Sequence, residues 1–110
     1  MAPSDSDFAI VVVRSGDRVT VALQGELDCY TGLELRDRLT DLIEDQGERH
    51  VAVDLRRLRF ADSTGLGVLL GAHRRLERHG GRLVVVGATA TAVKVLQLTG
   101  MDQVLTLAGP

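Results

Sequence analysis

A predicted strand leads into a predicted helix through the segment Phe60-Ala61-Asp62-Ser63-Thr64-Gly65-Leu66-Gly67-Val68-Leu69. Before this junction, apolar side chains alternate along Val51 to Leu55, which is typical of a strand, and an arginine-rich loop is expected to follow. Beyond it, apolar side chains recur at helical spacing from Leu66 to Leu76, which predicts a helix over residues 64–78. A strand joined to a helix in this way is the building unit of an α/β fold.

Strands and helices are also expected on both sides of the junction. Sequence periodicity predicts strands over residues 8–13, 19–23, 83–86 and 104–107, and helices over residues 32–46 and 90–98. Turn residues at Ser15-Gly16-Asp17 predict that the first two strands form an antiparallel hairpin. Thr31 and Glu34 have the spacing of a capping box, which would begin a helix near Gly32, and Gly47 would end it.

The predicted order is β-β-α-β-α-β-α-β. Short β-α-β units favour parallel pairing, so the expected fold class is α/β, a mixed sheet with amphipathic helices on one or both faces. The nearly continuous apolar run from Leu83 to Val86 predicts a strand that is buried on both faces. One domain is expected over residues 8–110, after a flexible N-terminal tail of residues 1–7.

Composition narrows the function classes. The chain has 110 residues and a net charge of −2, and only 3% of its residues are aromatic, so neither its charge nor its rings favour nucleic acid or membranes. Cys29 is the only cysteine, which excludes an internal disulfide and favours a reducing compartment. The first residues lack the features of a secretory signal, and no apolar run approaches the roughly 18 residues of a membrane span. A cytoplasmic protein is therefore expected.

Helix formation explains only part of the junction segment. Ser63 is a suitable helix cap, and Asp62 beside it would complement the positive end of the helix. Gly65 and Gly67, by contrast, would each cost the helix about 0.5–1 kcal/mol relative to alanine. These glycines indicate either backbone kept bare for a partner protein, beside the hydroxyls of Ser63 and Thr64, or a helix packed closely against the sheet.

Four blocks of the sequence resemble, in order and spacing, the stand-alone STAS domain of bacterial anti-sigma factor antagonists. They are Gly25-Glu26-Leu27-Asp28, Val53-Asp54-Leu55, the junction segment 60–69, and Gly80-Gly81 ahead of a valine-rich strand. The likeness spans residues 8–107, so the expected domain over residues 8–110 would be a single STAS domain.

The resemblance implies a regulator of transcription that works by partner switching and is not an enzyme. The unphosphorylated form would bind an anti-sigma factor, itself a serine kinase, and so free a sigma factor. Phosphorylation at Ser63, with Thr64 as the second candidate, would block binding, and a metal-dependent serine phosphatase would reverse it. No cofactor is implied. The partner-binding residues would be Asp28, Asp62, Ser63, Thr64, Gly65 and Gly67.

Charge gives a physical reason for such a switch. A phosphoryl group at Ser63 would add about −1.5 to −2 units of charge. Asp62 is adjacent in sequence, and Asp28 would be near if the end of the hairpin lies beside this helix; otherwise Asp28 is only a turn residue. Like charges brought together at an interface cost several kcal/mol, so a partner fitted to neutral Ser63 would dissociate.

Other function classes have less support. Gly71 lies one residue beyond the spacing of a Gly-x-Gly-x-x-Gly loop, no lysine follows as in a Walker loop, and Ser63 is not in a Gly-x-Ser-x-Gly elbow. His50, His73 and His79 lack metal-ligand spacing, so no metal site is expected, and His73 is expected to be a structural histidine facing the core. The alternative function within the same fold is a STAS scaffold or sensor subunit of a signalling assembly that does not act on a sigma factor.

Overall fold

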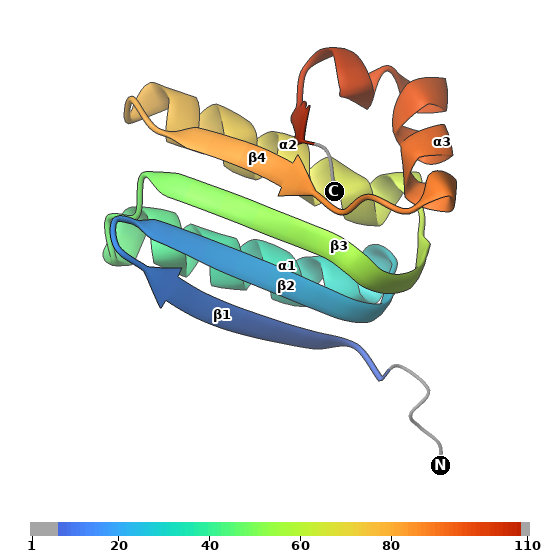
Figure 1. The fold of residues 1–110 in the computed structure, drawn as a ribbon, viewed down its shortest axis with the longest axis horizontal. Helices are drawn as coiled ribbons and strands as arrows, with labels where there is room; N and C mark the ends of the chain where they lie inside the picture. Colours follow the sequence, from blue (N-terminus) through green and yellow to red (C-terminus); the bar gives the residue numbers. More distant parts are fainter. Residues whose placement is uncertain (1–6, 109–110) are drawn as a thin grey trace.

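Five strands and three helices follow one another in the predicted order in this computed structural model, which describes residues 7–108 (Figure 1). The predicted tail of residues 1–7 therefore lies, except for Asp7, outside the described residues. The strands are β1 (Ala9–Ser15), β2 (Arg18–Leu27), β3 (His50–Ala61), β4 (Arg82–Val86) and β5 (Thr106–Ala108). The helices are α1 (Cys29–Thr40), α2 (Ser63–Arg78) and α3 (Ala90–Thr99), with a π-helical turn over Asp41–Asp45 and a 3-10 turn over Met101–Gln103.

The strands form one mixed sheet in the order β1-β2-β3-β4-β5. β1 and β2 are antiparallel, with Ala9 facing Gln24 at one end and Ser15 facing Arg18 at the other, so the predicted hairpin is confirmed. β2, β3, β4 and β5 are parallel to their neighbours. The expected α/β class and mixed sheet are confirmed.

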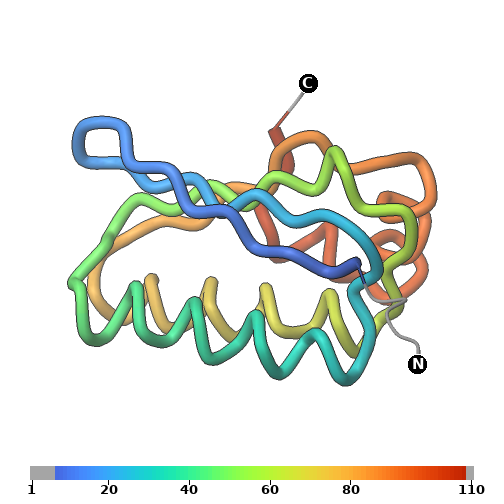
Figure 2. Tube along the Cα trace, turned by 90° about the horizontal axis from the view of Figure 1, so that it is seen from below, coloured from blue at the N-terminus to red at the C-terminus, as the bar shows by residue number. Residues whose placement is uncertain are grey.

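The main helices cover one face of this sheet. Figure 2 shows α1 and α2 side by side beneath the strands, while α3 lies near the carboxyl ends of β3 and β4 (Figures 1 and 2). Along β4, Leu83 and Val85 are fully buried, but Val84 and Val86 are only half-buried. The prediction that this strand is buried on both faces is therefore wrong, because neither α1 nor α2 covers the second face.

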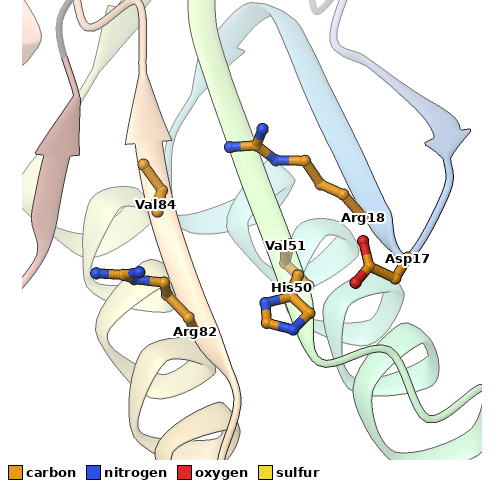
Figure 3. A pocket seen from close by; sticks show the side chains of 6 residues that line it. All are labelled: Asp17, Arg18, His50, Val51, Arg82 and Val84. Atoms are coloured by element: carbon orange, nitrogen blue, oxygen red, sulfur yellow. The ribbon is translucent and has the colours of Figure 1, made fainter.

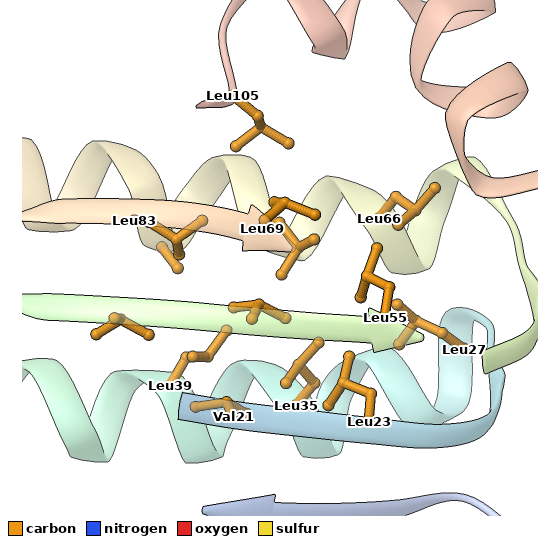
Figure 4. Close-up of a cluster of buried hydrophobic side chains, with 14 of the residues drawn as sticks. Val21, Leu23, Leu27, Leu35, Leu39, Leu55, Leu66, Leu69, Leu83 and Leu105 are labelled. Atoms are coloured by element: carbon orange, nitrogen blue, oxygen red, sulfur yellow. The ribbon is translucent and has the colours of Figure 1, made fainter. Parts of the chain in front are cut away.

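The core between the sheet and the two helices is built almost entirely from leucine and valine, as the scarcity of aromatic residues requires (Figure 4). Each fully buried leucine contributes about 1.5–3 kcal/mol of hydrophobic stabilisation. The sheet and both helices supply these side chains, and among the most deeply buried are Leu23, Leu27, Leu35, Leu39, Leu55, Leu66, Leu69 and Leu83.

The first helix begins three residues earlier than predicted. Its N-cap is Asp28, whose Oδ1 accepts hydrogen bonds from the backbone N–H groups of Tyr30 and Thr31, each at 2.9 Å. The Thr31 hydroxyl accepts the backbone N–H of Asp28 at 2.8 Å, which completes the capping box. Thr31 is thus the third residue of the helix and not its cap, because the carboxylate of Asp28, three residues upstream, accepts the backbone N–H groups of Tyr30 and Thr31.

The predicted arginine-rich loop is also wrong, because Arg56 to Arg59 are part of β3. The pairing of β3 with β2 shifts register twice, between Ala22 and Gln24 and again between Gly25 and Glu26 of β2. Each shift is a bulge that places an extra residue in β3 and breaks the period-two pattern of a strand. The core-facing residues of this part of the strand are therefore spaced by three, at Leu55, Leu58 and Ala61.

Within residues 7–108, none of the helices combines the length and the apolar character that crossing a membrane requires.

Candidate functional site

Two helices begin side by side at the carboxyl ends of β2 and β3. Leu27 and Ala61 are paired at the ends of these parallel strands, and the next residues, Asp28 and Asp62, are the N-caps of α1 and α2. The backbone N–H of Asp62 donates to the carbonyl of Leu27 at 3.1 Å, which ties the two strand ends together. The structure therefore brings Asp28 near the junction segment, as expected if the hairpin lies beside the second helix.

Asp62, and not Ser63, caps α2. The Asp62 Oδ1 accepts the backbone N–H of Gly65 at 2.8 Å, so Ser63 is the first residue inside the helix. Ser63 and Thr64 are both exposed, and within residues 7–108 neither hydroxyl makes a side-chain hydrogen bond. The prediction that Ser63 caps the helix is therefore wrong, because Asp62 is the cap. The Ser63 hydroxyl is exposed on the surface.

The cap at Asp28 favours the ionised form of its own carboxyl group. The backbone N–H of Thr31 is the main cause that lowers the pKa of Asp28 below its ordinary value of 3.8; partial desolvation opposes this, while Tyr30 and the Thr31 hydroxyl reinforce it. The Thr31 hydroxyl also donates to the carbonyl of Glu26 at 2.9 Å, which anchors the cap to β2. Asp28 is therefore more than a turn residue, since it organises the start of α1.

Gly65 allows the two helices to approach the end of β2. A Cβ atom at Gly65 would lie 2.7 Å from Leu27 Cγ and 2.9 Å from the Leu27 carbonyl oxygen. One at Gly32 in α1 would lie 3.4 Å from the Cα atom of Gly65. For Gly65, the structure thus favours the alternative of close packing, because any side chain would push α2 away from the sheet.

Close packing does not require glycine at position 67. A Cβ atom there would meet nothing within 4 Å, and the same holds for Gly71 one turn later. Both border a shallow cavity of about 290 Å³ between α1 and α2, whose lining also includes Thr64, Val68 and Arg75. The two glycines of the motif therefore have different physical roles, with Gly65 needed for packing and Gly67 leaving an open surface.

Exposed apolar side chains gather at this end of the molecule, and the sequence analysis missed them. Tyr30 is 80% exposed and Leu33 is 52% exposed, both on α1 just after Asp28, and Phe60 near the end of β3 is 46% exposed. Tyr30 and Phe60 are two of only three aromatic residues in the chain. A correct start for the first helix would have included Tyr30, which, like Leu33, lies off the buried stripe of Leu35 and Leu39.

No metal chemistry is supported by the residues described. Within residues 7–108, no group of three or more His, Cys, Asp or Glu side chains is arranged to hold a metal ion. His73 is largely buried, as predicted, and its Nε2 atom lies 3.4 Å from Glu77 Oε2, but its Nδ1 atom has no hydrogen-bond partner in this part of the chain.

A second pocket, of about 270 Å³, lies toward the amino ends of the parallel strands (Figure 3), whereas Ser63 follows the carboxyl end of β3. Its lining side chains come from the amino ends of β2, β3 and β4 and from the preceding turn, and include Asp17, Arg18, His50 and Arg82. None of the predicted site residues lines it.

Comparison with known proteins gives a consistent result. The STAS domain family model matches residues 9–109. An anti-sigma F factor antagonist of Paenibacillus polymyxa is 31% identical over 85 residues, which is 77% of this chain and 73% of that protein. An anti-sigma-B factor antagonist of Staphylococcus aureus is 33% identical over 85 residues, which is 77% of this chain and 78% of that protein.

Solved structures agree with these relatives. The unphosphorylated form of the anti-sigma factor antagonist SpoIIAA has a TM-score of 0.77 at 30% identity, over 91% of this chain and 88% of that one. The phosphorylated form of the Bacillus cell fate determinant SpoIIAA has a TM-score of 0.73 at 29% identity, over 91% of both chains. These homologues are antagonists of regulatory proteins and not enzymes, in agreement with the prediction that the chain is not an enzyme.

The different roles of the two motif glycines can be tested by matched alanine substitutions. We expect Gly65→Ala to reduce the free energy of unfolding by about 1–3 kcal/mol, because the added methyl group overlaps Leu27. Gly67→Ala should leave stability unchanged or raise it by about 0.5–1 kcal/mol, since the methyl group enters open space on a helix. Urea unfolding followed by circular dichroism measures both, and equal effects of the two substitutions would contradict the assignment.

The cap at Asp28 predicts a specific pH dependence. Because the folded-state pKa is lowered, the unfolded chain binds more protons at acidic pH, and the stabilisation by this carboxylate is present above pH 3.8 and lost as pH falls through the folded-state value. Asp28→Asn keeps a capping oxygen but removes this titration. Between neutral pH and pH 3, the wild type should therefore lose more unfolding free energy than the variant; parallel profiles in urea unfolding would refute the role.

Proposed function

Since the chain belongs to the STAS domain family, we propose that it is an anti-sigma factor antagonist switched by phosphorylation of Ser63. In this proposal the unphosphorylated form binds an anti-sigma factor and thereby frees a sigma factor. The observation that carries it is the free, exposed hydroxyl of Ser63 at the first position of α2, where Asp62 has taken over the capping role. The 29% identical SpoIIAA, which occurs in a phosphorylated form, supports a hydroxyl as the regulated group.

The two aspartates make the surface sensitive to a further negative charge. Asp28 and Asp62 both accept backbone N–H groups at helix starts, so both carboxyl groups are held in place at this surface. A phosphoryl group on Ser63 would add about −1.5 to −2 units of charge beside them. The N-terminus of α2 stabilises an anion, so the domain would remain folded while a partner fitted to the neutral surface is repelled.

Binding to the anti-sigma factor would depend on exposed apolar side chains at the same end of the molecule as Ser63. Tyr30 and Leu33 supply exposed apolar area beside Asp28, and interfaces between proteins are enriched in such aromatic residues. Thr64 and Gly67 extend this surface along the cavity between α1 and α2. Gly65 would contribute indirectly, because it holds α2 close to Leu27.

The proposed cycle needs two further proteins. The anti-sigma factor would itself be the serine kinase, so that the protein bound by the unmodified surface also inactivates it. A metal-dependent serine phosphatase would then restore the Ser63 hydroxyl. Both enzymes are carried over from the resemblance of the motif blocks to this family, and Thr64 is the second candidate acceptor.

The acceptor can be mapped directly. We expect incubation with ATP and the anti-sigma kinase of the same organism to place one phosphate on Ser63, identified by mass spectrometry of the intact chain and its peptides. Ser63→Ala should abolish the modification, and Thr64→Ala, which removes the neighbouring exposed hydroxyl, should retain it. Equal labelling of Ser63→Ala and the wild type would exclude Ser63 as the acceptor.

The charge mechanism has its own test. Ser63→Asp should fold as the wild type does, but its Kd for the anti-sigma factor should rise by roughly 100-fold or more, since like charge at an interface costs several kcal/mol. Ser15→Asp is the matched control, because Ser15 is an exposed serine at the far end of the β1–β2 hairpin. Undiminished affinity of Ser63→Asp, measured by isothermal titration calorimetry, would count against the mechanism.

A further inference from the structure

β1 is an edge strand of the sheet, with an inner side toward β2 and an outer side away from it. β1 is the first strand in the order, and all seven of its residues pair with β2 on the inner side without a register shift. Within residues 7–108, no strand pairs with its outer side (Figure 1). Alternate backbone N–H and C=O groups of β1 therefore point away from the sheet without a strand partner.

Most of this edge lacks the usual protections against strand pairing. Proteins generally shield edge strands with charges, proline, bulges or short length. The stretch Ala9-Ile10-Val11-Val12-Val13 contains no charge and no proline, and its pairing with β2 has no bulge. By contrast, β5 at the other edge has only three residues. One edge of the same sheet is thus protected, whereas the other is left able to accept a strand.

Apolar side chains lie on both sides of this edge. Val11 and Val13 are 50% and 54% exposed, and they pair with Ala22 and Thr20, on the face of the sheet opposite the buried Val21 and Leu23. Ile10 and Val12 point the other way and pack partly against the core. A strand added to β1 would therefore extend the sheet's hydrogen bonding and cover apolar surface on both faces.

We propose that β1 pairs with β1 of a second copy of this chain in antiparallel orientation, joining two sheets across a two-fold axis. The near-neutral composition of the strand favours a second copy of this chain as the partner. Arg14 is the only charged side chain in the strand, and it already forms an ion pair with Glu48 and donates a hydrogen bond to Gln46. The remaining edge is neutral and β-branched, which makes it complementary to itself and gives a charged segment of another protein nothing to pair with.

Charge also selects the orientation. In a parallel pair of β1 strands the two Arg14 residues would stand opposite each other, and like charges in that position destabilise a sheet. In the antiparallel arrangement each Arg14 lies toward the other end of the pair, and the neutral Ile10–Val13 stretches face one another. A two-fold contact of this kind uses the same surface on both copies.

The pairing would leave the Ser63 surface free. Ser63 follows β3, whereas the new contact involves only the outer edge of β1, two strands away in the sheet. The resulting dimer would carry two copies of that surface on one continuous sheet. This inference does not depend on the proposed function, because it requires neither phosphorylation nor an anti-sigma factor.

The test uses the full 110-residue chain in sedimentation equilibrium over a wide concentration range. The wild type should sediment as two 11.8 kDa chains at high concentration. Val11→Lys/Val13→Lys places charges on exposed positions of the edge and should weaken the dimer on the order of tenfold or more, with an unchanged circular dichroism spectrum. Leu98→Lys is the control, since Leu98 is 78% exposed on α3, and it should dimerise like the wild type.

Hydrogen exchange of the wild type provides a second measurement that does not depend on any variant. The outward-pointing amides among Ala9–Val13 should exchange more slowly as the protein concentration rises, whereas those of β5 should not change. A wild type that stays monomeric at all concentrations, a dimer unaffected by the lysines, or β1 exchange that is independent of concentration would each overturn the proposal.

Discussion

The contact between Gly65 of α2 and Leu27 of β2 is the constraint on which the arrangement of the site depends. With no side chain at Gly65, the first turn of α2 lies directly against the end of β2, and the start of α1 lies against α2 through Gly32. Both helices therefore leave the sheet at one place and run together beneath the same face. The leucines of β2, β3, α1 and α2 then meet in a single core, so the site and the core share the same packing constraint.

At this site two aspartates cap the helices, while the hydroxyls of Ser63 and Thr64 stay exposed. Asp28 and Asp62 satisfy the N–H groups at the two helix starts, which would otherwise compete for the hydroxyls of nearby residues. The hydroxyl of Ser63 is consequently exposed, and it stands where the dipole of α2 accommodates an anion. In the proposed function, one motif therefore supplies both the helix cap and the phosphate acceptor, and a change of surface charge would need no change of fold.

The errors of the sequence analysis have definite causes. The alternation that marks a strand was recognised from Val51 to Leu55 and then lost, because two bulges in β3 change the spacing of its buried residues from two to three. The first helix was started late, because Thr31 has the sequence signature of a cap but is in fact the third residue of a box begun by Asp28. The late start left Tyr30, which is 80% exposed, outside the predicted helix.

The sequence by itself determined the order of strands and helices and the α/β class, and it singled out the segment around Ser63 as the candidate site. It could do so because periodicity, glycine placement and motif spacing are properties of local sequence. Tertiary structure alone decided which glycine is needed for packing and which face of the sheet stays uncovered. Each of these depends on the distance between residues that are remote in the chain, such as Leu27 and Gly65. Such distances are set by the packing of the whole core, and no local pattern of residues encodes them.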